Sequence, residues 1–163
     1  MSYITRDGML YLKRKLLSYK KALPEIIERV ATAREMGDLS ENAEYHASKE
    51  SQRNLEKDIL LINKKLTNLQ VIDTEDLSDD VIRFGFFIKL LDLVSLKHVT
   101  YRLVGPDEID MDFEKEILGI SFVSPIGKAL VGKKIGEIIK VRVPSGEKKY
   151  KVLNIWKKGK INV

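Results

Sequence analysis

Two stretches of the chain carry mostly apolar or small residues at alternating intervals of three and four positions. In the first stretch these residues are Met9, Leu12, Leu16, Tyr19, Leu23, Ile26, Val30 and Ala33, and in the second they are Tyr45, Ser48, Gln52, Leu55, Ile59, Ile62, Leu66 and Leu69. This spacing is typical of the seam along which two helices pack as a coiled coil. Because the connection between the stretches is short, we predict an antiparallel hairpin of two helices.

The seam predicts uneven packing along the hairpin. Pairing about the turn sets Ile26 against Gln52 and Val30 against Ser48, so we expect the helices to pack less well near the turn than at the base. Pro24 lies inside the first helix, where it removes a backbone hydrogen bond, and it predicts either a kink or two short helices end to end.

The ends of the two helices carry capping signals. Thr5 is expected to cap the first helix, and Gly37 to end it. Asp38 or Ser40 is expected to begin the second helix, since Asp38 and Glu41 have the spacing of a capping box.

Composition narrows the class of protein. The 163 residues suit one medium domain or two small ones, and no apolar run is long enough to span a membrane. The N-terminus lacks the apolar core of a signal peptide. There is no cysteine and only two histidines, so disulfides, thiolate metal sites and a histidine-based zinc site are not expected. We therefore expect a cytoplasmic protein with no membrane partner.

Charge is divided unevenly along the chain. Residues 1–80 hold 13 basic and 15 acidic side chains, whereas residues 81–163 hold 16 basic and 9 acidic ones, a balance of +7. A basic half suits an acidic partner, either nucleic acid or an acidic protein surface, and it is also compatible with a basic domain that is merely well solvated.

The sequence of the second half of the chain indicates a small α+β domain. Acidic residues cluster at 72–80, which we interpret as a linker between a helical domain at 1–75 and a β-rich domain at 76–163. Strand-like patterns follow at 81–96, 100–104, 137–143 and 148–155, with a hairpin loop at 144–146. One short helix is expected after Ser124 as N-cap and Pro125 as first residue. We predict a mainly antiparallel sheet packed on this helix.

Candidate functional residues gather where the helical hairpin turns. Asp38, Glu41 and Glu44 lie within seven residues of one another at the expected start of the second helix. Such acids commonly cap free N–H groups and favour the positive end of the helix dipole. The alternative is a divalent-metal role: Mg²⁺ usually takes one or two protein carboxylates, so Asp38 and Glu41 suit a shared site completed by a partner, with Glu44 in support.

Basic residues lie close to these acids. Lys49 and Arg53 are one helical turn apart on the second helix, and Arg34 approaches the turn on the first. They suit contacts with a phosphate backbone, and they equally suit an ordinary solvated face.

Several motifs resemble the GreA/GreB family of bacterial transcript-cleavage factors. The residues 37–47, with sequence GDLSENAEYHA, are similar to the hairpin-tip motif of that family. The segments RLVG at 102–105, SPIGKAL at 124–130 and PSGE at 144–147 are similar to its second domain, and Pro24 with the residues after it also fits. The resemblance covers almost the whole chain.

The resemblance implies a function. The antiparallel coiled coil would enter the secondary channel of RNA polymerase, where Asp38 and Glu41 would help to hold a Mg²⁺ ion that the polymerase also binds. Cleavage near the 3′ end of backtracked nascent RNA would follow, by the logic of two metal ions. Arg34, Lys49 and Arg53 would contact the RNA, and an FKBP-like second domain would bind the polymerase, with Ser124 and Pro125 as contacts. The chain would act as a monomer and would not itself be an enzyme.

Two alternatives remain open. A channel-binding inhibitor on the same scaffold would need altered acids, and the intact pair Asp38 and Glu41 argues against it. A stand-alone prolyl isomerase with a helical arm would rest on the fold alone.

Overall fold

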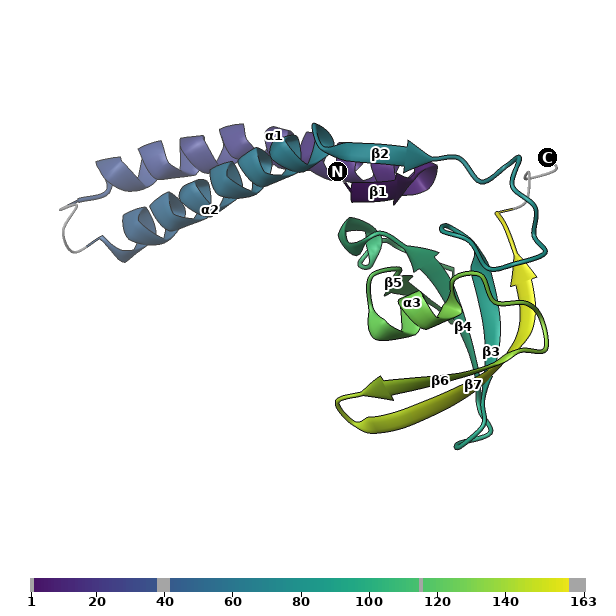
Figure 1. The fold of residues 1–163 in the computed structure, drawn as a ribbon. Helices are drawn as coiled ribbons and strands as arrows, with labels where there is room; N and C mark the ends of the chain where they lie inside the picture. Colours follow the sequence, from purple (N-terminus) through teal and green to yellow (C-terminus); the bar gives the residue numbers. More distant parts are fainter. Residues whose placement is uncertain (1, 38–41, 115, 159–163) are drawn as a thin grey trace. The chain divides into compact units, whose positions relative to one another are not determined.

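The computed structural model describes residues 2–37, 42–114 and 116–158 (Figure 1). The chain divides into two compact units. The first, here called the hairpin, is Met9–Leu69, and the second, the sheet unit, comprises Met1–Gly8 together with Gln70–Val163. The first eight residues thus pack with the second half of the chain, which the ranges expected from sequence do not anticipate. The α+β class is confirmed.

The hairpin consists of α1 (Arg6–Glu35) and α2 (Ala43–Leu66), which lie side by side in Figure 1. The helix α1 is continuous through Pro24, so the alternative of two separate short helices is wrong. Every position of the predicted seam is buried or half-buried, while most of the residues between them are exposed. Neither helix, nor any other in the described part of the chain, is long and apolar enough to cross a membrane.

The expectation of weak packing near the turn is wrong. Val30 is 5% exposed, Ala33 1% and Ser48 4%, so these residues are buried as fully as Leu12 (4%) and Ile62 (7%) nearer the base. Side-chain size gives the reason, because Ala33 and Ser48 present little surface and the facing helix covers it. Pairing seam residues by apolarity alone does not predict the burial of such small side chains.

The sheet unit contains a five-stranded sheet with the order β5-β4-β3-β7-β6. Its strands are β3 (Phe87–Asp92), β4 (His98–Val104), β5 (Ile117–Ser121), β6 (Ile138–Val143) and β7 (Gly146–Trp156). Three of the four neighbouring pairs are antiparallel, as expected, and β4 with β5 is parallel. A 3₁₀ turn, η1 (Pro106–Glu108), follows β4.

Two short strands were not anticipated. β1 (Ser2–Thr5) and β2 (Leu69–Ile72) pair as a separate two-stranded sheet. Leu69 was expected to continue the helical seam, but α2 ends at Leu66 and Leu69 opens β2. The helical pattern extends past the true end because one apolar residue at the right spacing fits either structure.

The core of the sheet unit lies between the sheet and α3 (Pro125–Leu130). Ile88, Leu90, Leu103 and Val152 of the sheet and Leu130 of α3 are fully buried there. The predicted cap is confirmed, because the Ser124 hydroxyl oxygen accepts a hydrogen bond from the Gly127 N–H at 3.1 Å. Gly127 also has no room for a side chain, since a Cβ there would lie 2.0 Å from the Ser121 carbonyl oxygen. Capping and close approach together fix α3 against the end of β5.

A buried carboxylate ties the first residues of the chain to η1. Glu108 Oε1 accepts hydrogen bonds from both the N–H (3.0 Å) and the hydroxyl of Thr5, and Oε2 accepts one from the Gly105 N–H at 2.8 Å. Burial raises the pKa of Glu108, and the bonds from Thr5 and Gly105 oppose this rise. Thr5 caps α1 as predicted, since its hydroxyl accepts from the Gly8 N–H at 3.0 Å. Gly8 itself must lack a side chain, because a Cβ would lie 2.0 Å from Glu108 Oε1.

A second tie is the ion pair between Asp7 and Arg102. The buried guanidinium of Arg102 donates through two nitrogens to the two carboxylate oxygens of Asp7, with Nη2 3.1 Å from Oδ1. It also lies 4.8 Å from the ring centre of Phe87, which stacks on Trp156. Burial alone would raise the pKa of Asp7, but hydrogen bonding and charge attraction from Arg102, with Lys158 adding to them, lower it to about 2.

We predict that Asp7→Asn lowers the free energy of unfolding by about 2–3 kcal/mol at neutral pH, because a buried guanidinium loses its charged partner. The pKa of Asp7 is lower in the folded chain, about 2, than its ordinary 3.8. Its stabilisation, about 2 kcal/mol, is therefore present above pH 4 and is lost as the pH falls toward 2. Urea unfolding of both proteins at several pH values measures the difference.

The difference in stability between wild type and Asp7→Asn should shrink between pH 4 and pH 2. The effect of Glu108 has the opposite sign, but it is present in both proteins and cancels in the difference. Asp58→Asn, at an exposed position of α2, serves as the matched control and should change little at any pH. A constant difference across this range would show that the ion pair does not stabilise the fold.

Candidate functional site at the hairpin turn

The two predicted metal-binding acids, Asp38 and Glu41, lie outside the described residues. The residues on both sides of them are described and define the end of the hairpin. α1 ends at Glu35 and α2 begins at Ala43. Neither Asp38 nor Ser40 is therefore the residue that begins α2, and that expectation is corrected.

Asn42 is the cap of α2. Its side-chain oxygen accepts a hydrogen bond from the Tyr45 N–H at 3.1 Å, and its amide nitrogen donates to the Ala33 carbonyl oxygen at 2.6 Å. One side chain thus satisfies a free N–H group at the start of α2 and adds a second hydrogen bond to the Ala33 carbonyl at the end of α1, which also accepts from the Met36 N–H at 3.2 Å. The sequence held a signal for this, because Asn42 stands three residues before Tyr45, the first residue of the seam in α2. The capping-box spacing of Asp38 and Glu41 predicts an earlier start for α2, but the N-cap of this helix is Asn42.

The predicted RNA-contacting residues lie on one side of the hairpin. Arg34, in the last turn of α1, places its guanidinium 5.8 Å from the ring centre of Tyr45 on α2. Tyr45 is followed one and two turns later by Lys49 and Arg53, and residues at this spacing share a face. We call Arg34, Tyr45, Lys49 and Arg53 the basic face. The contact with Tyr45 places the guanidinium of Arg34 beside the start of α2. The structure assigns no ligand to these four residues.

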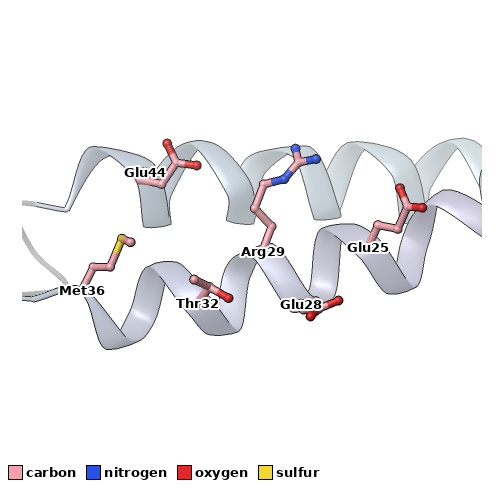
Figure 2. A pocket seen from close by; sticks show the side chains of 6 residues that line it. All are labelled: Glu25, Glu28, Arg29, Thr32, Met36 and Glu44. Carbon is pink, nitrogen blue, oxygen red and sulfur yellow. The ribbon is translucent and has the colours of Figure 1, made fainter.

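Acidic residues line a shallow groove that runs along the hairpin from the turn. Figure 2 shows its six side chains, with Glu44 on α2 and the others on α1. They are Glu25, Glu28, Arg29, Thr32, Met36 and Glu44. At roughly 100° per residue, Arg53 points about 180° away from Glu44, so the groove and the basic face lie on different sides of α2. The hairpin therefore presents negative charge on one side and positive charge on another.

Other predicted site residues are explained by local structure. Ser124 serves as the cap of α3, and Pro125 after it is exposed. Among the described residues, no group of three or more His, Cys, Asp or Glu side chains is placed to hold a metal ion. Glu44 is exposed in the first turn of α2, where a carboxylate favours the positive end of the helix dipole.

Comparison with known proteins gives matches over both halves of the chain. Residues 2–71 match the model of the N-terminal region of the transcription elongation factors GreA and GreB, and residues 77–157 match that of their C-terminal region. The chain is 43% identical over 150 residues to transcription elongation factor GreA of Rhodospirillum rubrum, covering 91% of this chain and 93% of that protein. It is 47% identical to GreA of Ralstonia nicotianae, with the same shares covered.

A third relative, GreA of Maridesulfovibrio salexigens, is 39% identical over 159 residues, covering 98% of this chain and 97% of that protein. A solved structure, GreA factor homolog 1 of Thermus thermophilus, is similar at 24% identity and a TM-score of 0.42, over 94% of this chain and 97% of that chain. With both regions matched and relatives near 40% identity along almost their full length, the chain belongs to the GreA/GreB family of transcription elongation factors.

Proposed function

We propose that this chain stimulates cleavage of the nascent RNA in stalled RNA polymerase. The hairpin enters the secondary channel of the polymerase and brings Asp38 and Glu41 to the 3′ end of backtracked RNA. The membership of the family supports this, together with one observation on the turn: Asn42 already caps α2. Asn42 thus occupies the N-cap position, which is the position that a capping role for Asp38 would require.

The shape of the hairpin suits such a role. The regular burial of its seam supports an antiparallel coiled coil, and the 30 residues of α1 make a rod about 45 Å long at 1.5 Å per residue. Its turn carries the acids to a depth that a compact domain cannot reach. The sheet unit is proposed to have an FKBP-like fold and to bind the polymerase outside the secondary channel, with the exposed Pro125 region as one contact.

Asp38 and Glu41 fit a shared magnesium site. Their carboxylates are the hard oxygen ligands that Mg²⁺ prefers, and two carboxylates leave most of its coordination to other groups. When bound, the ion supplies positive charge that offsets the charge developing on the attacked phosphate. The chain is accordingly a cofactor of the polymerase rather than an enzyme, since the polymerase must contribute the remaining ligands.

The basic face has a separate task in this proposal. Arg34, Lys49 and Arg53 bind the phosphate backbone of the extruded RNA and hold its 3′ segment beside the acids. Tyr45 keeps the guanidinium of Arg34 in place through the contact of 5.8 Å. Contacts of this kind position the RNA without reading its sequence.

We predict that Asp38→Asn and Glu41→Gln each remove most of the stimulated cleavage, at least tenfold, and leave polymerase binding and thermal stability nearly unchanged. Each substitution keeps the size of the side chain but removes the charge that a hard cation needs. Raising Mg²⁺ should partly restore the single variants by mass action and should not restore the double variant. Glu28→Gln, in the acidic groove but away from the turn, is the matched control and should keep its activity. Near-normal cleavage by both single variants would rule out the metal role.

Asn42→Ala separates the structural role of the turn from its chemistry. Loss of the cap and of the bond to Ala33 should cost about 1–2 kcal/mol of unfolding free energy. Cleavage should fall by less than in the acid variants, and added Mg²⁺ should not restore it, because the metal ligands are intact. Circular dichroism melting and cleavage assays on the same samples provide the test. An unchanged melting temperature would contradict the assignment of Asn42 as the cap.

A further inference from the structure

The five-stranded sheet has an outer face that α3 does not cover. Figure 1 shows α3 on one side of the sheet, where the core lies. Strand pairing identifies the residues on the other side, because directly paired residues share a face. Lys89 pairs with Asn154 and with Thr100, Leu91 with Lys151, Ile138 with Lys151, and Lys140 with Lys149. On β6 the residues between them, Ile139 and Val141, are buried in the core.

This outer face is strongly basic. It carries Lys89, Lys140, Arg142, Lys149 and Lys151, of which all but the half-buried Lys149 are exposed. Glu147, opposite Arg142 next to the turn that joins β6 and β7, is the acid that pairing places among them. Within the described ranges, none of the five cations forms an ion pair. These residues supply much of the positive balance of the second half of the chain.

The arrangement costs stability in the free protein. Lys140 lies directly opposite Lys149 on the neighbouring strand, and like charges at paired positions are destabilising. Lys151 follows on the same side of β7, about 6.8 Å further along the strand from Lys149. A cross-strand pair of opposite charge would be more favourable here. Local choices that oppose the fold are expected at functional sites.

We propose that this outer face binds the phosphodiester backbone of nucleic acid. Lys140 and Lys149 lie about 4.8 Å apart across neighbouring strands, and Lys151 follows Lys149 about 6.8 Å along β7. Lys89 lies on β3 opposite Asn154, diagonal to Lys151 on the same face. A chain of phosphates presents negative charge at a similar density, and contacts to it need no fixed side-chain geometry. Thr100 and Asn154 add hydrogen-bonding groups on the same face. The proposal is independent of the cleavage chemistry at the hairpin turn.

Nucleic acid suits the face better than an acidic protein does. Protein interfaces are usually centred on large apolar or aromatic anchors, and their cores are depleted of lysine. Here Leu91 and Ile138 flank Lys151 but form no large anchor, and the aromatic residues, Phe87 and Trp156, lie away from the lysines of β6 as a stacked pair beside Arg102.

The binding test uses the full chain and a fluorescein-labelled single-stranded RNA of about 20 nucleotides, with duplex DNA of equal length as a second arm. Fluorescence anisotropy is recorded between roughly 50 and 200 mM salt. The variant replaces Lys89, Lys140, Lys149 and Lys151 by Gln. The matched control replaces four exposed lysines of the hairpin, Lys13, Lys20, Lys57 and Lys64, and so has the same net charge.

We expect the sheet variant to lose at least tenfold in affinity at low salt, and the control less than threefold. The salt slope should fall by about 3, since each phosphate contact to a single strand contributes about 0.7. The arm that binds more tightly identifies the nucleic acid. Equal losses in variant and control would overturn the proposal, because net charge rather than this face would then be responsible. Binding of poly-glutamate as tight as that of RNA, with the same loss in the sheet variant, would overturn it in favour of an acidic protein.

A measurement on the wild-type protein guards against misfolding of the variant. Lysine acetylation is followed by mass spectrometry with and without the RNA. Bound nucleic acid should slow modification of Lys89, Lys140, Lys149 and Lys151 severalfold and leave Lys13 and Lys20 unchanged. Equal rates with and without RNA at the four sheet lysines would contradict the proposal, whatever the variant does.

Discussion

The ion pair between Asp7 and Arg102 is the contact on which the sheet unit depends most. Arg102 is a buried charge on β4, and its partner comes from the first turn of α1, 95 residues earlier. Lys158, near the other end of the chain, also contacts Asp7. Glu108 on η1 is a second buried carboxylate, and it accepts a hydrogen bond from the Thr5 N–H, also far away in the sequence. A fragment beginning at residue 76 would leave Arg102 without Asp7 and Glu108 without the bonds from Thr5. An unpaired buried charge costs several kcal/mol, which is a large share of the stability of a domain this size.

Sequence reasoning succeeded where the pattern is local and periodic. The seam of the hairpin, the caps at Thr5 and Ser124 and the strands β4, β6 and β7 follow from spacing and capping chemistry. It failed where the deciding contact is distant in sequence. β1 and β2 are short strands that pair only with each other, and the parallel partner β5 has no signal of its own. At the turn, Asp38 with Glu41 offered a more familiar capping pattern than Asn42, yet the bond from Asn42 to the end of α1 decides the outcome.

The two units are proposed to have separate tasks. In the hairpin, Asn42 caps α2, an acidic groove runs along one side from the turn, and a basic face lies on another. On the outer face of the sheet unit, Lys140 lies directly opposite Lys149 and neither forms an ion pair within the described residues, an arrangement that costs stability in the free protein. We propose that the basic face of the hairpin and the lysines of the sheet unit both bind a phosphate backbone.

The central claim is that catalysis requires the polymerase and this chain together. The most direct measurement follows 3′-end cleavage of labelled RNA under three conditions: this chain with RNA and Mg²⁺, a stalled polymerase complex alone, and the stalled complex with this chain. The account predicts no cleavage by the chain alone, slow cleavage by the polymerase, and acceleration of at least tenfold when both are present. Robust hydrolysis of free RNA by the pure chain, or no acceleration of the stalled complex, would contradict it.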